Sequence, residues 1–109
     1  MVYPIIPDLI EIGVDIFHPL EPLPANDHDA IKKEFGDRLT FMGAIDIKQA
    51  MPGTLADVEA EVRRRLDKLG RGGGYILAPA NHLGGIPPEN IVRLYEAARE
   101  LGSYPIRSD

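Results

Sequence analysis

The stretch GYILAPANHLGGIPPENIVRLYEAARELG, residues 74–102, decides the fold that we expect. Its first residues, GYILAPA (74–80), form a short apolar run that is typical of a buried strand. A polar turn that presents Asn81 and His82 follows, and Pro88 suits the first position of a helix. A strand, a polar turn and a helix in this order are how many α/β proteins present functional groups.

The same order of strand and helix occurs twice before this stretch. We expect one strand in GVDIFHPL (13–20), carried by Val14, Ile16 and Phe17, and another from Leu39 to Ile45. A short lead-in helix starts near Pro7 and stops at Gly13. Asn26 or Asp27 can cap a helix over about 29–35.

The helices of the second and third strand–helix units have stronger signals. Thr54 and Asp57 have the spacing of a capping box at a helix start. The apolar residues that follow lie at steps of three and four, which is one stripe of an α-helix. This stripe contains Leu55, Val58, Val62, Leu66 and Leu69, and the stripe of the last helix contains Ile91, Leu94, Tyr95, Ala98 and Leu101.

Apolar strands that alternate with amphipathic helices predict an α/β fold with a parallel sheet. In such sheets the functional groups collect at the carboxyl ends of the strands. Those ends carry His18 and Glu21, then Asp46, then Asn81 and His82. We therefore expect a candidate site at this edge of the sheet.

Composition narrows the classes of function. The net charge of -5 argues against a nucleic-acid backbone or an anionic membrane surface as partner. The chain has no Cys, which excludes disulfides and thiolate metal sites and makes a reducing cytoplasm the simplest location. No apolar run approaches the roughly 20 residues of a membrane span.

Three segments together resemble the uroporphyrinogen decarboxylase family, in its decarboxylase-like branch. They are LIEIGVDIFHPLEP (9–22), KKEFGDRLTFMGAIDIKQAMPGT (32–54) and the run from VEAEVRRRLDKLG to LYEAARELG (58–102). The resemblance implies a (β/α)8 TIM barrel, of which this chain carries about the last three βα units. Residues 1–109 would then be a single C-terminal fragment of an incomplete barrel.

The resemblance also implies an activity, the cofactor-free decarboxylation of tetrapyrrole acetate side chains in porphyrin biosynthesis. Asp46 matches a G-x-x-D segment after the seventh barrel strand, and His82 lies near the histidine after the eighth. We assign His82 and Asp46 to catalysis, and His18, Glu21 and Asn81 to substrate binding, with no metal and no cofactor.

The two catalytic assignments each have a structural alternative. His82 can be a turn histidine that touches the next helix, and Asp46 can cap the turn at 47–49. A metal pair of His18 and Glu21 is disfavoured by the intervening Pro19 and by the lack of a third close ligand.

Three other features are interpreted as structural. His28 is expected to be an exposed residue at a helix start, and Arg63-Arg64-Arg65 is expected on a solvated helix face. GRGGGY (70–75) lacks the Lys-Ser/Thr of a phosphate-binding loop and precedes a strand, which favours a flexible turn.

Three parallel strands cannot close a barrel, so we expect open sheet edges and an uncovered apolar face. Homo-oligomerisation or the missing part of the barrel would cover them. The family's pyrrole-binding aspartate and carboxylate-binding arginines belong to that missing part, and these strand ends are expected to supply no Arg or Lys. The isolated chain is therefore expected to be inactive.

Two alternatives remain open. One is a zinc-dependent relative that transfers methyl groups with corrinoid proteins, which the absence of Cys disfavours. The other is a non-catalytic fragment that associates with itself.

Overall fold

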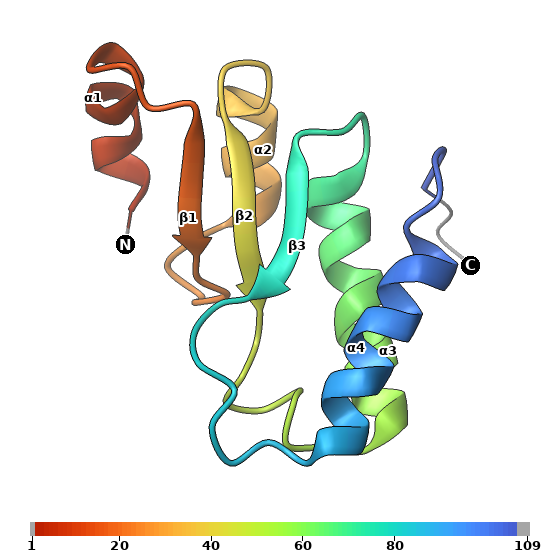
Figure 1. Ribbon diagram of the computed structural model, residues 1–109. Helices are drawn as coiled ribbons and strands as arrows, with labels where there is room; N and C mark the ends of the chain where they lie inside the picture. Colours follow the sequence, from red (N-terminus) through yellow and green to blue (C-terminus); the bar gives the residue numbers. More distant parts are fainter. Residues whose placement is uncertain (1, 107–109) are drawn as a thin grey trace.

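The computed structural model describes residues 2–106 as three parallel strands that alternate with helices (Figure 1). The elements in chain order are η1 (Tyr3–Ile5), α1 (Ile6–Glu11), β1 (Ile16–Leu20), α2 (His28–Phe35), β2 (Thr40–Ile45), α3 (Leu55–Arg65), η2 (Leu66–Gly70), β3 (Tyr75–Pro79) and α4 (Pro88–Leu101). The strands form one open sheet in the order β1-β2-β3. This confirms the predicted α/β class and the parallel βα units of an incomplete barrel.

The helix starts follow the local signals in the sequence. Asp27 caps α2 by accepting a hydrogen bond from the Ala30 N–H at 3.1 Å. Thr54 and Asp57 form the predicted capping box, with bonds of 3.1 and 2.8 Å in the two directions. Pro88 is the first residue of α4, where a missing N–H costs nothing.

Two apolar clusters hold the helices against one face of the sheet. In Figure 1, α2 lies behind the strands, and α3 and α4 lie beside β3. The first cluster joins β1 and β2 to the α2 residues Ile31 and Phe35. The second joins the end of β2 to Val58 and Val62 of α3 and to Leu94 of α4.

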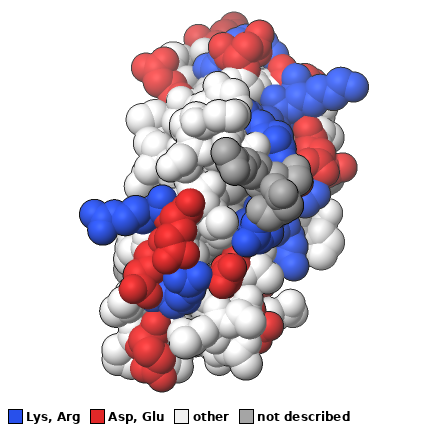
Figure 2. Space-filling model, turned by 90° about the vertical axis from the view of Figure 1, so that its right-hand side faces the viewer, with Lys and Arg blue, Asp and Glu red and all other residues white. Residues whose placement is uncertain are grey.

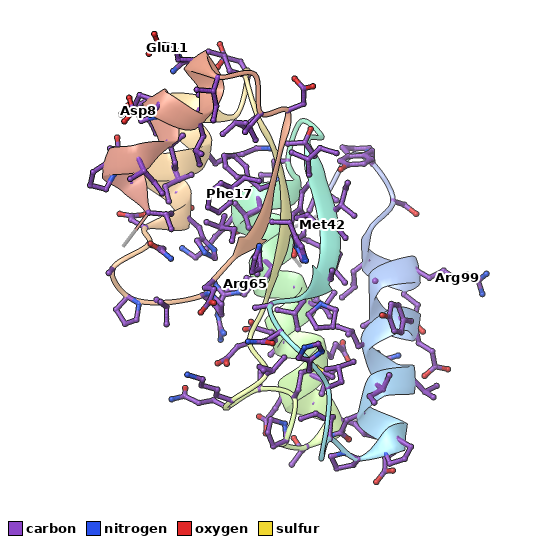
Figure 3. The ribbon with its side chains drawn as sticks, turned by 60° about the vertical axis from the view of Figure 1, so that its left-hand side comes forward. Asp8, Glu11, Phe17, Met42, Arg65 and Arg99 are labelled. Carbon is purple, nitrogen blue, oxygen red and sulfur yellow. The ribbon has the colours of Figure 1, made fainter. Side chains whose placement is uncertain are left out.

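In the described part of the chain, the opposite face of the sheet is uncovered. Side chains alternate along a strand, so Met42 lies on the other side of the sheet from Phe17 and its partner Phe41 (Figure 3). On the uncovered side Ile16 is 52% exposed and Ile76 is 42% exposed. Within residues 2–106 no element covers that face, which agrees with the uncovered apolar face expected from the sequence.

Most residues of the two predicted apolar helix stripes are buried or partly buried, and two are exposed. Val58, Val62, Leu66, Leu69 and Leu94 are buried. Leu55, in the first turn of α3, and Tyr95 of α4 are exposed instead.

The helical side of the molecule has a mixed charge. On the α4 face, Figure 2 shows basic side chains beside acidic ones rather than gathered into one patch. Arg93 pairs there with Glu59 at 2.9 Å and with Glu100 at 3.3 Å. Among residues 2–106, no helix has the length and apolar character that crossing a membrane requires.

Candidate functional site at the carboxyl edge of the sheet

The turns that follow the three strands border one hollow of about 410 Å³, which we call the carboxyl-edge hollow. Glu21 borders it after β1, Asp46 after β2 and Asn81 after β3. Parallel strands bring their carboxyl ends to the same edge, which is why residues so distant in the sequence meet here. The full lining comprises residues 21–24, residues 46–49, Ala80 and Asn81.

A second hollow of about 340 Å³ adjoins the first and shares Ala80 and Asn81 with it. His18 and His82 border this second hollow. The structure thus places all five predicted site residues at one edge of the sheet, in two neighbouring depressions. Their catalytic and binding roles stay predictions.

Asp46 has a structural role as well as a place in the hollow. Its Oδ1 accepts hydrogen bonds from the Lys48 N–H at 2.9 Å and from the Gln49 N–H at 3.4 Å. This is the turn-capping role that the sequence left open. Because Oδ1 is used in this way, Oδ2 is the oxygen that is oriented by the turn and available to a ligand.

The two histidines differ in how firmly they are held. His18 Nδ1 lies 3.3 Å from the Met42 carbonyl oxygen. A carbonyl only accepts, so Nδ1 donates, and Nε2 is the ring nitrogen left to face a ligand. The backbone N–H of His82 donates to Asn81 Oδ1 at 2.8 Å, which fixes the turn and leaves the His82 side chain exposed.

Sequence reasoning missed two polar residues that line the hollow. Lys48 and Gln49 border it together with Asp46, so these strand ends do supply a basic side chain, and the contrary expectation is wrong. The signal was present, because both residues belong to the turn directly after β2.

Two expectations about polar residues behind the hollow are also wrong. His28 was expected to be exposed, but it is only 4% exposed, since the Arg65 side chain and the turn at Glu21 lie against its ring. Of the three consecutive arginines, Arg65 is not solvated. Its side chain is 12% exposed, it pairs with the buried Glu61 at 2.9 Å, and it lies near the carboxyl end of β1 (Figure 3).

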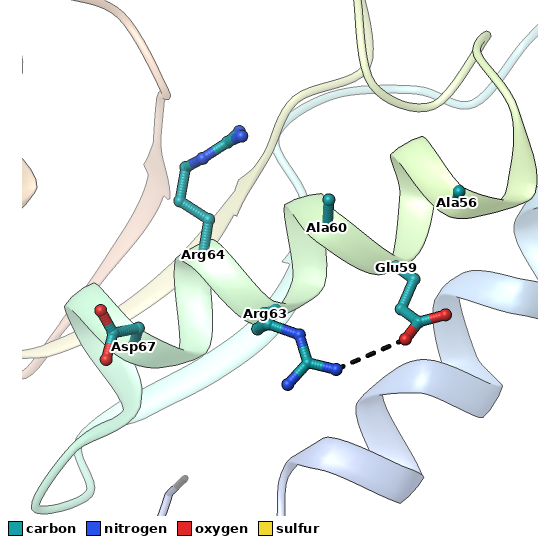
Figure 4. Close-up of a pocket in the computed structure, with 6 residues that line it drawn as sticks. All are labelled: Ala56, Glu59, Ala60, Arg63, Arg64 and Asp67. Carbon is teal, nitrogen blue, oxygen red and sulfur yellow. Dashed lines mark hydrogen bonds and ion pairs between the residues drawn. The ribbon is translucent and has the colours of Figure 1, made fainter. Parts of the chain in front are cut away.

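A further hollow on the outer surface of α3 is not part of this site. Figure 4 shows Ala56 and Ala60 along the helix, while Glu59 and Arg63 turn toward α4 and pair at 3.4 Å. Its lining comes from α3 and the helical turn after it, and no strand end contributes. Across residues 2–106, no three His, Asp or Glu side chains lie close enough together to hold a metal ion.

Comparison with known proteins supports one family. No curated protein matches the chain. The family described as uroporphyrinogen decarboxylase (URO-D) matches residues 2–101 of the 109 residues, and this match covers all three strands and all four α-helices. The chain therefore belongs to the uroporphyrinogen decarboxylase family.

Proposed function

We propose that this chain is the C-terminal part of a uroporphyrinogen decarboxylase-like enzyme and that its carboxyl-edge hollow contributes to the decarboxylation site. The observation that carries the proposal is the meeting of Glu21, Asp46 and Asn81 around one hollow, with His18 and His82 beside it. Family membership supports the reaction class. In this proposal a carboxylate-bearing tetrapyrrole is the substrate and no cofactor takes part.

The chemistry gives each group a role. Loss of CO2 from a pyrrole acetate breaks the bond between the carboxylate and the methylene carbon, and the electron pair moves toward the ring. A proton must then reach that carbon, and the exposed imidazole of His82 is suited to deliver it. Asp46 Oδ2 would accept a hydrogen bond from a substrate N–H, and Lys48 would attract a substrate carboxylate.

The open sheet implies that the site needs completion. A second copy or the remaining βα units of the barrel would cover the uncovered face and close the other side of the hollow. The isolated chain is then expected to bind a tetrapyrrole weakly and to show no turnover. Adding the remaining barrel units as a separate polypeptide should restore decarboxylation.

The test is a titration of the chain with uroporphyrin, followed by fluorescence, with and without the added polypeptide. Asp46→Asn should weaken binding about tenfold, as expected for the loss of a hydrogen bond to a charged group. Asp37→Asn is the matched control, because Asp37 is exposed and lies outside both hollows. Absence of binding in the completed assembly, or equal effects of the two variants, would contradict the proposal.

One observation favours a second candidate, a non-catalytic chain that associates with itself. The exposed Ile16 and Ile76 form an apolar surface that a second copy can cover without any substrate. Chromatographic analysis of porphyrin products separates the two functions. Decarboxylation that His82→Gln abolishes supports the enzyme, while a stable assembly without binding or turnover supports the second candidate.

A further inference from the structure

A buried carboxylate stands behind the carboxyl-edge hollow. Glu61 of α3 is 1% exposed and accepts three hydrogen bonds. Its Oε2 accepts from the Asp46 backbone N–H at 2.8 Å and from Arg65 Nε at 2.9 Å, while Oε1 accepts from Arg64 Nη1 at 2.8 Å. A carboxylate is stable in the interior only with such partners. β2 ends at Ile45, so the Asp46 N–H is the first backbone donor after the strand, and it bonds to the Glu61 carboxylate.

Arg65 connects this carboxylate to the turn after β1. Its Nη1 lies 3.4 Å from His28 Nδ1, and His28 Nε2 lies 3.1 Å from the Glu21 carbonyl oxygen. A carbonyl only accepts and a guanidinium only donates. His28 must therefore be neutral, with its proton on Nε2 and its Nδ1 lone pair facing Arg65.

The contacts form one continuous path between two turns of the hollow. It runs from the Asp46 N–H through Glu61, Arg65 and His28 to the Glu21 carbonyl. Both ends are backbone groups of residues that border the hollow, whereas none of the three connecting side chains does. The path therefore acts on the position of the turns rather than on a ligand.

We propose that Glu61, Arg65 and His28 are positioning residues that hold the Glu21 and Asp46 turns at a fixed spacing across the hollow. The inference rests on the proposed function of that hollow. Asn26 adds a second donor to the Glu21 carbonyl at 3.2 Å, which strengthens the β1 end of the path. Arg65 has no such substitute among residues 2–106, where it is the side chain that joins the Glu61 carboxylate to His28.

Amide hydrogen exchange, resolved by NMR, tests the proposal without a ligand. The Asn26 amide, bonded to the Leu23 carbonyl, reports on the first turn, and the Asp46 amide reports on the second. Arg65→Met should speed exchange at both amides by at least about tenfold. The Phe41 amide, bonded to Gly74 in the sheet, should keep its rate.

Arg63→Met is the matched control, because Arg63 lies on the same helix and pairs with Glu59 rather than with Glu61. It should leave both turn amides unchanged. Unchanged exchange in Arg65→Met, or faster exchange that includes Phe41 to the same extent, would overturn the proposal.

Arg65→Lys provides an independent reading if Arg65→Met does not fold. A single ammonium group cannot span both Glu61 and His28 as the guanidinium fork does. It should keep the Asp46 amide protected and release the Asn26 amide, and protection of both amides would overturn the proposal.

The uroporphyrin titration separates this inference from the proposed function. Faster exchange with weaker uroporphyrin binding in Arg65→Met supports both. Faster exchange with unchanged binding supports the positioning role and removes the hollow as the binding site. Unchanged exchange overturns the positioning role, whatever happens to binding.

Discussion

His28 is a titratable group in the interface between α2 and α3, and its surroundings favour the neutral form. Burial lowers the pKa of His28, and the charges of Arg65 and Lys68 lower it further, while the Glu21 carbonyl and Glu61 act in the opposite direction. Protonation would place an N–H on Nδ1, directly toward the Arg65 guanidinium. The residue is therefore stable as a neutral donor and costly as a cation.

The lowered pKa predicts how stability depends on pH. In the unfolded chain a histidine takes up its proton near pH 6.5, before the folded His28 does. The His28 contribution to the free energy of unfolding is fully present above about pH 6.5 and is lost as the pH falls toward the folded pKa. Wild type should therefore lose more stability on acidification than His28→Gln, which does not titrate.

Urea unfolding at about pH 7.5 and about pH 5.5 measures this difference, since the two values bracket the ordinary histidine pKa. His82→Gln is the control, because it removes an exposed histidine and should follow wild type. An equal loss of stability in wild type and His28→Gln would contradict the prediction.

At the level of elements, α4 also holds the loop that follows β2. Asn90, which is 3% exposed, donates from Nδ2 to the Met51 carbonyl at 2.6 Å and to the Gly53 carbonyl at 2.8 Å. Glu61 holds the first residue of the same loop, at Asp46. The loop that carries Asp46 is thus fastened at both ends by side chains of two helices.

Asn90→Ala should lower the free energy of unfolding by about 2 kcal/mol, because two carbonyl acceptors lose their donor inside the protein. Asn90→Asp has the same shape but no N–H donor, so it should be at least as damaging as Ala. Denaturant titration measures both, and Glu96→Ala is the control at an exposed position of the same helix. Full stability of Asn90→Asp would show that the donor is not what holds the loop.

Elements were predictable where their signals are local. The capping box of Thr54 and Asp57 and the start of α4 at Pro88 depend on neighbours in the chain, and both are confirmed. The burial of His28 and Glu61 depends on partners from other elements, which no periodicity in one segment encodes. The exposure of Ile16, by contrast, follows from the number of strands, because three parallel strands leave the apolar face uncovered that the sequence predicts.

The candidate site also has a part that was predictable from the sequence and a part that was not. The parallel order of strands predicted that His18, Glu21, Asp46, Asn81 and His82 would meet at one edge, and they do. The polar path behind them was not predictable, because Glu61 and Arg65 have the spacing of an ordinary surface ion pair on a helix. Only the packing of α2 and β2 against α3 turns that pair into a buried connection.

At the scale of the whole molecule, the described sheet has two open edges and one uncovered face. β1 and β3 are both edge strands, and β1 contains Pro19, a residue that edge strands tolerate. The uncovered face exposes Ile16 and Ile76. An open parallel sheet with one bare face is rare among stable monomers, because parallel sheets are normally covered on both faces. This supports the expectation that a second copy or the missing part of the barrel covers it.

We therefore predict that the 12.0 kDa chain associates through this face and that Ile76→Glu weakens the association. Burying an isoleucine contributes about 1.5–3 kcal/mol, so its loss should raise the dissociation constant at least about tenfold. Light scattering coupled to size-exclusion chromatography measures the mass of each species over a dilution series.

Val92→Glu is the matched control, because Val92 is 57% exposed on α4 and lies away from the sheet. It introduces the same charge and should leave the assembly intact, while circular dichroism verifies that both variants keep their helices. A wild-type chain that stays monomeric, or an assembly that both variants weaken equally, would contradict association through the bare face. In the monomeric case the carboxyl-edge hollow would remain open on the side where a completed barrel encloses it, and decarboxylation would then depend on the remaining barrel units rather than on a second copy.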